Sequence, residues 1–136
     1  MKKAISIWSF PGEWALDRKL AVAREAGFEG FEIDLTENGP VGMKTSKEDL
    51  LSVRRKVENA GLQLSGLATG LYWGTNAASA DAEVRRRASN ILQRQISCAV
   101  DLGIDAVLVV PAAVGVDFIP GAEVVRYVTA YERAQA

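Results

Sequence analysis

The feature that most constrains the fold of this chain is a short motif that occurs three times. In each copy a helix-like segment ends in glycine, an apolar residue follows, and a strand-like run begins; the copies are EAGF at 25–28, NAGL at 59–62 and DLGI at 101–104. Glycine at this place supplies the left-handed backbone conformation that ends a helix, and the apolar residue after it packs back onto that helix. We therefore expect three helix-to-strand junctions of one kind.

Strands and helices alternate around these junctions. Apolar residues recur at helical spacing before each glycine, and again from about Gly121 to the end of the chain. The second of these helices begins with a predicted capping box, Ser46-Lys47-Glu48-Asp49. Strands are predicted over residues 3–8, 30–35, 62–68 and 105–110. A strand followed by a helix, four times over, predicts parallel β-α-β units with right-handed crossovers.

The strands carry a second pattern, because three of the four alternate apolar and polar residues. Only the fourth reads as a continuous apolar run, AVLVV at 106–110, as expected for strands buried on both faces of a doubly wound sheet. In the second strand Phe31, Ile33 and Leu35 would face the helices, and Glu32 and Asp34 would lie on the opposite face. A polar second face favours the interior of a barrel that opens into a ligand site.

The length of the chain indicates how many βα units of a barrel it can form. A (βα)8 barrel typically needs about 250 residues, and this chain has 136. The sequence therefore predicts an α/β fold of four parallel βα units in a single domain over residues 1–136. That is half of a (βα)8 TIM barrel, which a second chain could complete.

Charge and residue content exclude several classes of function. Sixteen Lys and Arg against seventeen Asp and Glu argue against a nucleic-acid-binding protein, because such proteins carry excess positive charge. The chain has no histidine, which excludes Ser-His-Asp and Cys-His catalysis and every His-ligated metal centre within it. A metal held here would need oxygen ligands, which suits Mg or Mn. The one cysteine, Cys98, is expected to be a small core residue.

No segment is expected to enter a membrane. The opening MKK and the apolar run after it imitate a signal peptide, but Pro11 and Gly12 interrupt the run and no credible cleavage site follows. The uncharged stretch 59–80 carries Gly66, Gly70 and Gly74 at the spacing of packed transmembrane helices, yet it holds too many polar groups to span a bilayer. These glycines instead predict close approach of the backbone to a ligand or neighbour. We expect a cytoplasmic protein.

Several segments together resemble a known family. They are ISIWSF at 5–10, AGFEGFEI at 26–33, LSGLATGLYW at 64–73, LGIDAV at 102–107 and LVVP at 108–111. In this order and spacing they resemble the xylose-isomerase-like TIM-barrel superfamily, within it the sugar-phosphate isomerases and epimerases of the hexulose-phosphate isomerase and tagatose 3-epimerase types. The resemblance covers the N-terminal half of the family's pattern.

The resemblance also implies what this chain does not supply. Family members hold a divalent metal, Mn or Mg, with two Glu, an Asp and a His from the second half of the barrel. The chain has no histidine and ends at residue 136, before the strand expected to bring the first ligand. We therefore expect no metal ligands and no cofactor in this chain, and no isomerase activity of the chain alone.

Four residues near the ends of the first two strands are candidate sugar contacts. Glu32 and Asp34 share the polar face of the second strand near its carboxyl end, where active sites of β/α barrels gather. Trp8 is expected to end the first strand on the same face as Ser6, with Trp14 in the loop after it. Aromatic rings can pack against the apolar faces of sugars. The alternatives are a paired interior acid for Glu32, a loop cap for Asp34 and core packing for both tryptophans.

Three further candidates lie later in the chain. Tyr72 and Trp73 follow the third strand in a loop, where an exposed pair otherwise suggests lid packing or a subunit contact. Arg85 lies early in the third helix, whose positive dipole end could favour a sugar phosphate. A solvated surface arginine is the alternative.

The sequence thus supports one hypothesis and leaves two alternatives open. The first is the N-terminal half of a sugar or sugar-phosphate isomerase/epimerase barrel that supplies a pocket wall. It would be completed by a C-terminal half-barrel or a second copy, without nucleic-acid or membrane partners. The second is a non-catalytic or engineered half-barrel scaffold that forms homodimers. The third is a flavodoxin-like domain that binds a small ligand.

Overall fold

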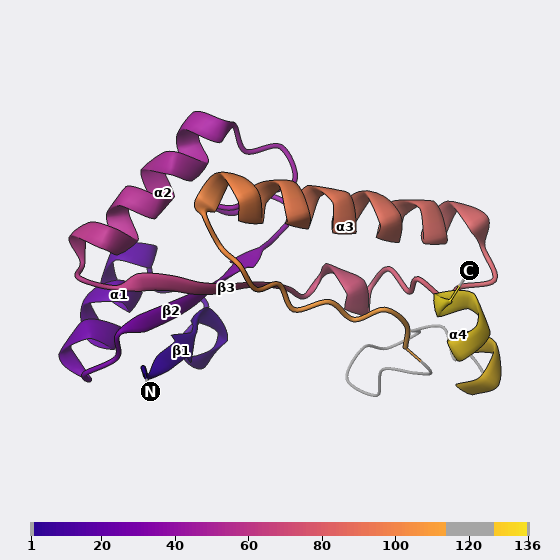
Figure 1. Cartoon of the computed structure of the whole chain (residues 1–136), viewed down its shortest axis with the longest axis horizontal. Helices are drawn as coiled ribbons and strands as arrows, with labels where there is room; N and C mark the ends of the chain where they lie inside the picture. The colour runs from indigo at the N-terminus through magenta and orange to yellow at the C-terminus, as the bar shows by residue number, and fades with distance from the viewer. Residues whose placement is uncertain (1, 114–126, 136) are drawn as a thin grey trace.

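The computed structural model describes residues 2–113 and 127–135 (Figure 1). Along the chain the elements are β1 (Ala4–Ser6), the 3-10 helix η1 (Ile7–Ser9), α1 (Leu16–Glu25), β2 (Gly30–Leu35), α2 (Lys47–Asn59), β3 (Gln63–Thr69), the 3-10 helix η2 (Leu71–Trp73), α3 (Ala82–Leu102) and α4 (Tyr127–Ala134).

All three predicted helix-to-strand junctions are present. Gly27, Gly61 and Gly103 follow α1, α2 and α3 with φ angles of 81°, 76° and 68°, in the left-handed region that glycine adopts without steric cost. At each junction the amide of the apolar residue that follows bonds back to the helix, as Ile104 N does to Ala99 O at 2.8 Å. The predicted cap of the second helix is present, because the Ser46 hydroxyl accepts the amide of Asp49 at the start of α2. The carboxylate of Asp49 accepts the Ser46 hydroxyl rather than the Ser46 amide of a full capping box.

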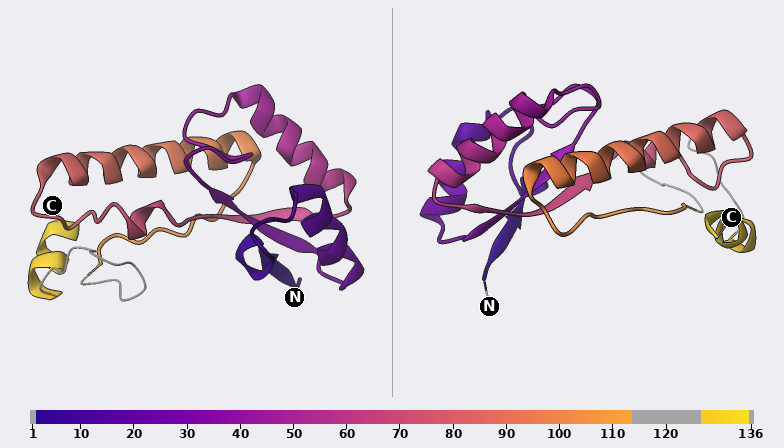
Figure 2. Two further views of the ribbon diagram at one scale, coloured as in Figure 1. Left: turned by 180° about the vertical axis from the view of Figure 1, so that it is seen from behind. Right: turned by 45° about the horizontal axis from the view of Figure 1, so that its top comes forward.

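The three strands form one parallel sheet in the order β1-β2-β3. Helices α1, α2 and α3 lie on one side of this sheet, and the other side carries no helix among the residues described (Figures 1 and 2). A flavodoxin-like sheet has helices on both faces and places its first strand between the second and third. The sequential order and one-sided helices are those of a barrel wall, so the α/β half-barrel prediction is confirmed and the flavodoxin-like alternative is not supported.

The core lies between the sheet and these helices. Phe31, Ile33 and Leu35 of β2 are fully buried on the helix-facing side, as the alternation predicted. Cys98 of α3 is fully buried in the same cluster. Glu32 and Asp34 are only half-buried, and they lie on the face that none of these helices covers.

The fourth predicted strand is much reduced. Residues 105–110 run beside β3 (Figure 1) but pair with it only through one parallel bridge, between Leu67 and Val107. Val107 and Leu108 remain 38% and 49% exposed. The apolar run predicted a strand buried on both faces, and that prediction is wrong for the described structure because no further strand pairs with the free edge of this segment among the residues described.

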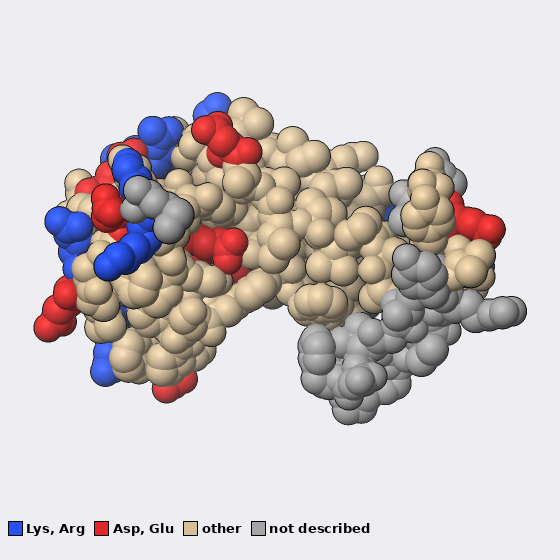
Figure 3. Space-filling view, turned by 60° about the horizontal axis from the view of Figure 1, so that its bottom comes forward, with Lys and Arg blue, Asp and Glu red and all other residues tan. Residues whose placement is uncertain are grey.

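The open side of the sheet is visible in space-filling view (Figure 3). Lys, Arg, Asp and Glu side chains gather at the end of the molecule that carries β1, α1 and α2, and the middle of this face is mostly uncharged. Helix α4 lies at the opposite end (Figure 2), where the Arg133 guanidinium donates to Ala78 O at 2.6 Å. The part of the last predicted helix before Tyr127 lies outside the described residues.

Candidate functional site

The candidate site is a pocket at the carboxyl ends of β1 and β2. It has a volume of about 480 Å³, and its walls come from η1, the loop before α1, the first turns of α1 and the loop after β2. The side chains that matter for its chemistry are Trp8, Trp14, Lys19 and Asp34. Ligand sites of β/α barrels lie at this end of the strands, so the pocket is where the fold predicts one.

Trp8 and Asp34 are joined directly. The Trp8 indole Nε1 donates to Asp34 Oδ2 at 3.0 Å, and Trp8 remains 47% exposed. The prediction that Trp8 ends the first strand is wrong, because β1 stops at Ser6 and the chain turns into η1. The turn begins where the Ser6 hydroxyl accepts the Trp8 amide. Trp8 therefore reaches Asp34 from a turn rather than from the sheet face.

Trp14 forms a second aromatic wall of the pocket. It lies in the loop before α1, as predicted, and its ring centroid is 6.4 Å from that of Phe10. The Arg18 guanidinium carbon lies 3.9 Å from the centroid of the Trp14 ring, a cation–π contact. Both contacts restrain the ring, so the tryptophan is positioned before any ligand arrives.

Glu32 lies beside this pocket rather than in its wall. Its carboxylate packs over Gly66 of β3, where a Cβ atom would stand 3.3 Å from Glu32 Oε2. Gly66 is thus a strand residue that leaves room for a carboxylate, in keeping with the predicted close approach. Glu32 faces the open side of the sheet, and a role in binding sugar stays a prediction.

Tyr72 and Trp73 are not brought together with Trp8 and Asp34. They form η2 rather than an open loop, and the expectation that both are exposed is wrong for Tyr72, which is 3% exposed. Its hydroxyl donates to Gln95 Oε1 at 2.9 Å. Burial raises the pKa of the Tyr72 hydroxyl. Contact of this pair with a sugar is untested and stays a prediction.

Arg85 forms hydrogen bonds with the segment just before its own helix. Its guanidinium donates to the backbone oxygens of Ser79 and Ala80 at 2.8 and 2.9 Å. It therefore holds the segment that leads into α3, and these two bonds favour a structural role over phosphate binding.

Lys19 is a charged residue of the pocket that the sequence did not predict. It lies in α1 and is 8% exposed, although lysine is seldom buried without a partner. No sequence signal marks it, because Leu16, Leu20 and Ala23 define the apolar face of α1 and Lys19 simply precedes Leu20.

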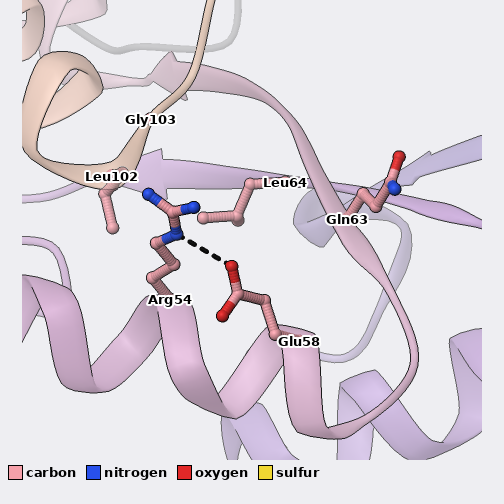
Figure 4. A pocket seen from close by; sticks show the side chains of 6 residues that line it. All are labelled: Arg54, Glu58, Gln63, Leu64, Leu102 and Gly103. Carbon is pink, nitrogen blue, oxygen red and sulfur yellow. Dashed lines mark hydrogen bonds and ion pairs between the residues drawn. The ribbon is translucent and has the colours of Figure 1, made fainter.

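A second pocket lies at the opposite, amino end of β3 (Figure 4). Arg54 and Glu58 of α2 line it, together with Leu64 and Gly103. Arg54 Nε forms an ion pair with Glu58 Oε1 at 2.8 Å, so the two charged side chains of this pocket are paired with each other. In β/α barrels this end contributes stability rather than chemistry.

The donor set does not fit a metal ion. Among residues 2–113 and 127–135, no three His, Cys, Asp or Glu side chains lie close enough together to hold one. We therefore derive no step through a metal for these residues.

Comparison with known proteins identifies the family. The family model described as "Xylose isomerase-like TIM barrel" matches residues 20–135. The chain belongs to this family. The family predicted from the sequence motifs is therefore confirmed.

This chain superposes on solved structures of sugar epimerases. A D-psicose 3-epimerase determined in the presence of D-fructose superposes with a TM-score of 0.74 at 20% identity, over 98% of this chain and 45% of that one. A D-psicose 3-epimerase with D-tagatose from Clostridium cellulolyticum H10 gives 0.72 at 16% identity, over 98% and 45%. An L-ribulose 3-epimerase gives 0.65 at 20% identity, over 98% and 42%. The chain thus spans less than half the length of each.

The sequence matches no curated protein. Within the described residues, no helix is long and apolar enough to cross a membrane.

Proposed function

We propose that this chain acts as the N-terminal half of a sugar isomerase or epimerase barrel and supplies one wall of the substrate pocket. The observation that carries the proposal is the pocket at the carboxyl ends of β1 and β2, in which Trp8, Trp14 and Asp34 converge. The family and the fold of the sugar epimerases support it.

The residues of this wall are suited to binding and orienting a sugar. The rings of Trp8 and Trp14 offer apolar faces against which sugar C–H groups pack. Trp8 occupies Asp34 Oδ2, which fixes the carboxylate and leaves Oδ1 to accept a sugar hydroxyl. Glu32 would meet the substrate from the centre of the barrel.

In the completed barrel the reaction would move a proton between carbons that flank the ketose carbonyl. Such a step needs a general base near that carbon. We expect the base and the Mn or Mg ligands on the other half, together with any contribution of Tyr72 and Trp73 to the sugar pocket. The chain alone is expected to be inactive, and a cytoplasmic location is part of the same proposal.

A second candidate function is a half-barrel that pairs with its own copy. It is favoured by the exposed Val107 and Leu108 on the fourth segment and by β1, which pairs with β2 alone among the described strands. A C-terminal half-barrel would cover the same edges. Either partner would close the barrel.

The binding proposal is tested by titrating the full chain with D-fructose and D-tagatose and following the three tryptophan indole N–H signals by NMR. We expect the Trp8 and Trp14 signals to shift in a saturable way. Asp34→Asn should weaken binding several-fold, because it removes the charged acceptor, whereas Glu48→Gln on exposed α2 should not. Saturable binding that leaves Trp8 and Trp14 unmoved, or no binding to a folded chain, would overturn the proposal.

A further inference from the structure

We propose that Lys19 and the first turn of α1 form an anion site in this pocket, and that the site takes the phosphate group of a sugar phosphate. The inference rests on the proposed function for the sugar, but the anion site itself is carried by different observations. They are the burial of Lys19, its lack of a partner among the described residues, and the uncapped start of α1.

Lys19 is a buried cation without a counter-charge in the described part of the chain. It is 8% exposed, and no acceptor among the described residues forms a hydrogen bond or ion pair with it. No fully enclosed side-chain nitrogen or oxygen in this part of the chain lacks a partner. The ammonium of Lys19 is therefore not fully enclosed, although the residue is buried, and since Lys19 lines the pocket we infer that the ammonium opens to it.

Burial distinguishes Lys19 from the lysines that have partners in the described part of the chain. Lys47 and Lys56 pair with Asp101 and Asp17, and their side chains are 70% and 49% exposed. Lys2, which donates to Gln63 Oε1, is also exposed. In Lys19 the carbon stem is enclosed while the ammonium is not, an arrangement in which the charged end stays accessible. With no partner among the described residues, this ammonium is available to an anion in the pocket.

The start of α1 offers further donors at the same place. Its N-cap residue, Ala15, has no side chain that can bond the first amides, whereas Ser46 and Asp81 cap α2 and α3. The amides of Leu16 and Asp17 have no acceptor among the described residues. Ala15 and Leu16 line the same pocket as Lys19.

Lys19 and the start of α1 line one pocket. Long side chains in a helix point back toward its N-terminus as a rule, and on this rule we infer that the Lys19 ammonium lies near the first turn of its own helix. An ammonium and the free amides of a helix start are the groups that bind phosphate in proteins. A phosphate monoester, with three acceptor oxygens, matches one ammonium and two amides better than a neutral hydroxyl does.

The rest of the pocket indicates what carries the phosphate. Trp8 and Trp14 offer ring faces, and Asp34 is an acceptor for hydroxyl groups rather than for a second anion. A molecule with a phosphate at one end and hydroxyl-bearing carbons beyond it meets all of these groups. The pocket therefore favours a phosphorylated ketose over the free sugar.

The test compares D-fructose, D-fructose 6-phosphate and inorganic phosphate on the full chain, by calorimetry and by the Trp8 and Trp14 indole signals. We expect the phosphorylated ketose to bind at least about tenfold more tightly than the free ketose, with an affinity that falls as salt rises. Lys19→Gln should remove this preference and Lys19→Arg should keep part of it. Lys44→Gln, at an exposed lysine without a partner in the described residues, should leave it unchanged.

Thermal unfolding distinguishes a structural role of Lys19 from a role in binding phosphate. Lys19→Met should keep the midpoint of thermal unfolding or raise it while the phosphate preference is lost, because it keeps an apolar stem in the enclosed space and removes only an ammonium that no described residue pairs with. A lower midpoint would mean that Lys19 holds the fold together and would overturn the proposal.

The outcomes also distinguish the two proposals. Equal binding of the ketose and its phosphate, or equal losses in Lys19→Gln and Lys44→Gln, would overturn the anion site and leave the sugar wall standing. Binding of inorganic phosphate that depends on Lys19, without any ketose binding, would support the anion site and overturn the sugar wall. No binding of any probe to the folded chain would overturn both.

Discussion

The side chain of Gln95 links β3 to the segment predicted as the fourth strand. It is fully buried in α3, and its Nε2 donates to Leu67 O at 2.9 Å and to Leu108 O at 3.0 Å. Its Oε1 accepts the Tyr72 hydroxyl. Three bonds from one amide thus connect β3, η2 and the segment that would be the fourth strand.

Replacing Gln95 with leucine should be costly although the two side chains have similar size. The Tyr72 hydroxyl and the Leu108 carbonyl would lose the bond with Gln95, and the Leu67 carbonyl would keep only the amide of Leu108. Each enclosed polar group left without a partner costs about 1–3 kcal/mol. We expect Gln95→Leu to lower the free energy of unfolding by at least about 2 kcal/mol in urea titrations. Gln93→Leu, at an exposed position of the same helix, is the matched control; equal effects would contradict this role of Gln95.

Tyr72 gives a pH dependence with a definite sign. Burial raises the pKa of its hydroxyl above the ordinary 10.0. Below pH 10 the group is protonated in both the folded and the unfolded chain, and its contribution to stability is fully present. Above pH 10 the unfolded chain loses this proton first, so the free energy of unfolding falls with rising pH until the folded group also ionises.

Alkaline unfolding of two variants checks this. Tyr72→Phe should lose less stability above pH 10 than the unchanged chain, whereas Tyr131→Phe, at an exposed tyrosine, should follow the unchanged chain. Burial also raises the pKa of the Cys98 thiol, but both variants keep that group. Identical alkaline profiles for all three proteins would refute the assignment.

At the scale of the elements, the junction glycines are the most direct link between sequence and fold. Gly27 has a φ of 81°, and a methyl group added there would meet no atom within 4 Å; Gly12 has the same open space without a positive φ. Gly27→Ala should therefore cost about 1–2 kcal/mol of stability from backbone conformation alone. Gly12→Ala, the matched control, should cost little; the difference is measured by thermal or urea unfolding, and equal effects would contradict this role of the junction glycine.

What the sequence predicts well is local. The glycine ends of α1, α2 and α3, the Ser46 cap and the alternation along β2 depend on neighbours in the chain, and the structure has all of them. Strand length is not local. The first strand ends two residues before Trp8, because the chain turns into η1 although β2 continues to Leu35. The fourth is reduced to one bridge. Neither length is marked in the sequence of the strand itself.

The site divides in the same way. Asp34 could be predicted from its place near the end of β2, and Trp14 from its loop. The contact of Trp8 with Asp34 and the burial of Lys19 depend on how the loop 7–15 and α1 fold over the sheet. No pattern in the sequence reports such packing, so only the structure identifies Lys19.

At the scale of the whole molecule, one face of the sheet is open where a complete barrel would enclose it. The sheet face that carries Glu32 and Asp34 is free of helices in the described part of the chain (Figures 1 and 2). Val107 and Leu108 are exposed beside β3, and α3 exposes Ile96 and Val100. A monomer would leave these apolar residues and the outer strand edge in water.

The central claim is that this chain is half of a closed barrel, and the solution mass of the purified chain tests it most directly. Alone in solution, the half-barrel should cover its open edges with a second copy, and light scattering after size exclusion should give about 29 kDa, twice the 14.7 kDa of one chain. A monomer of 14.7 kDa that unfolds cooperatively would contradict the account, because its sheet would then be stable without another half.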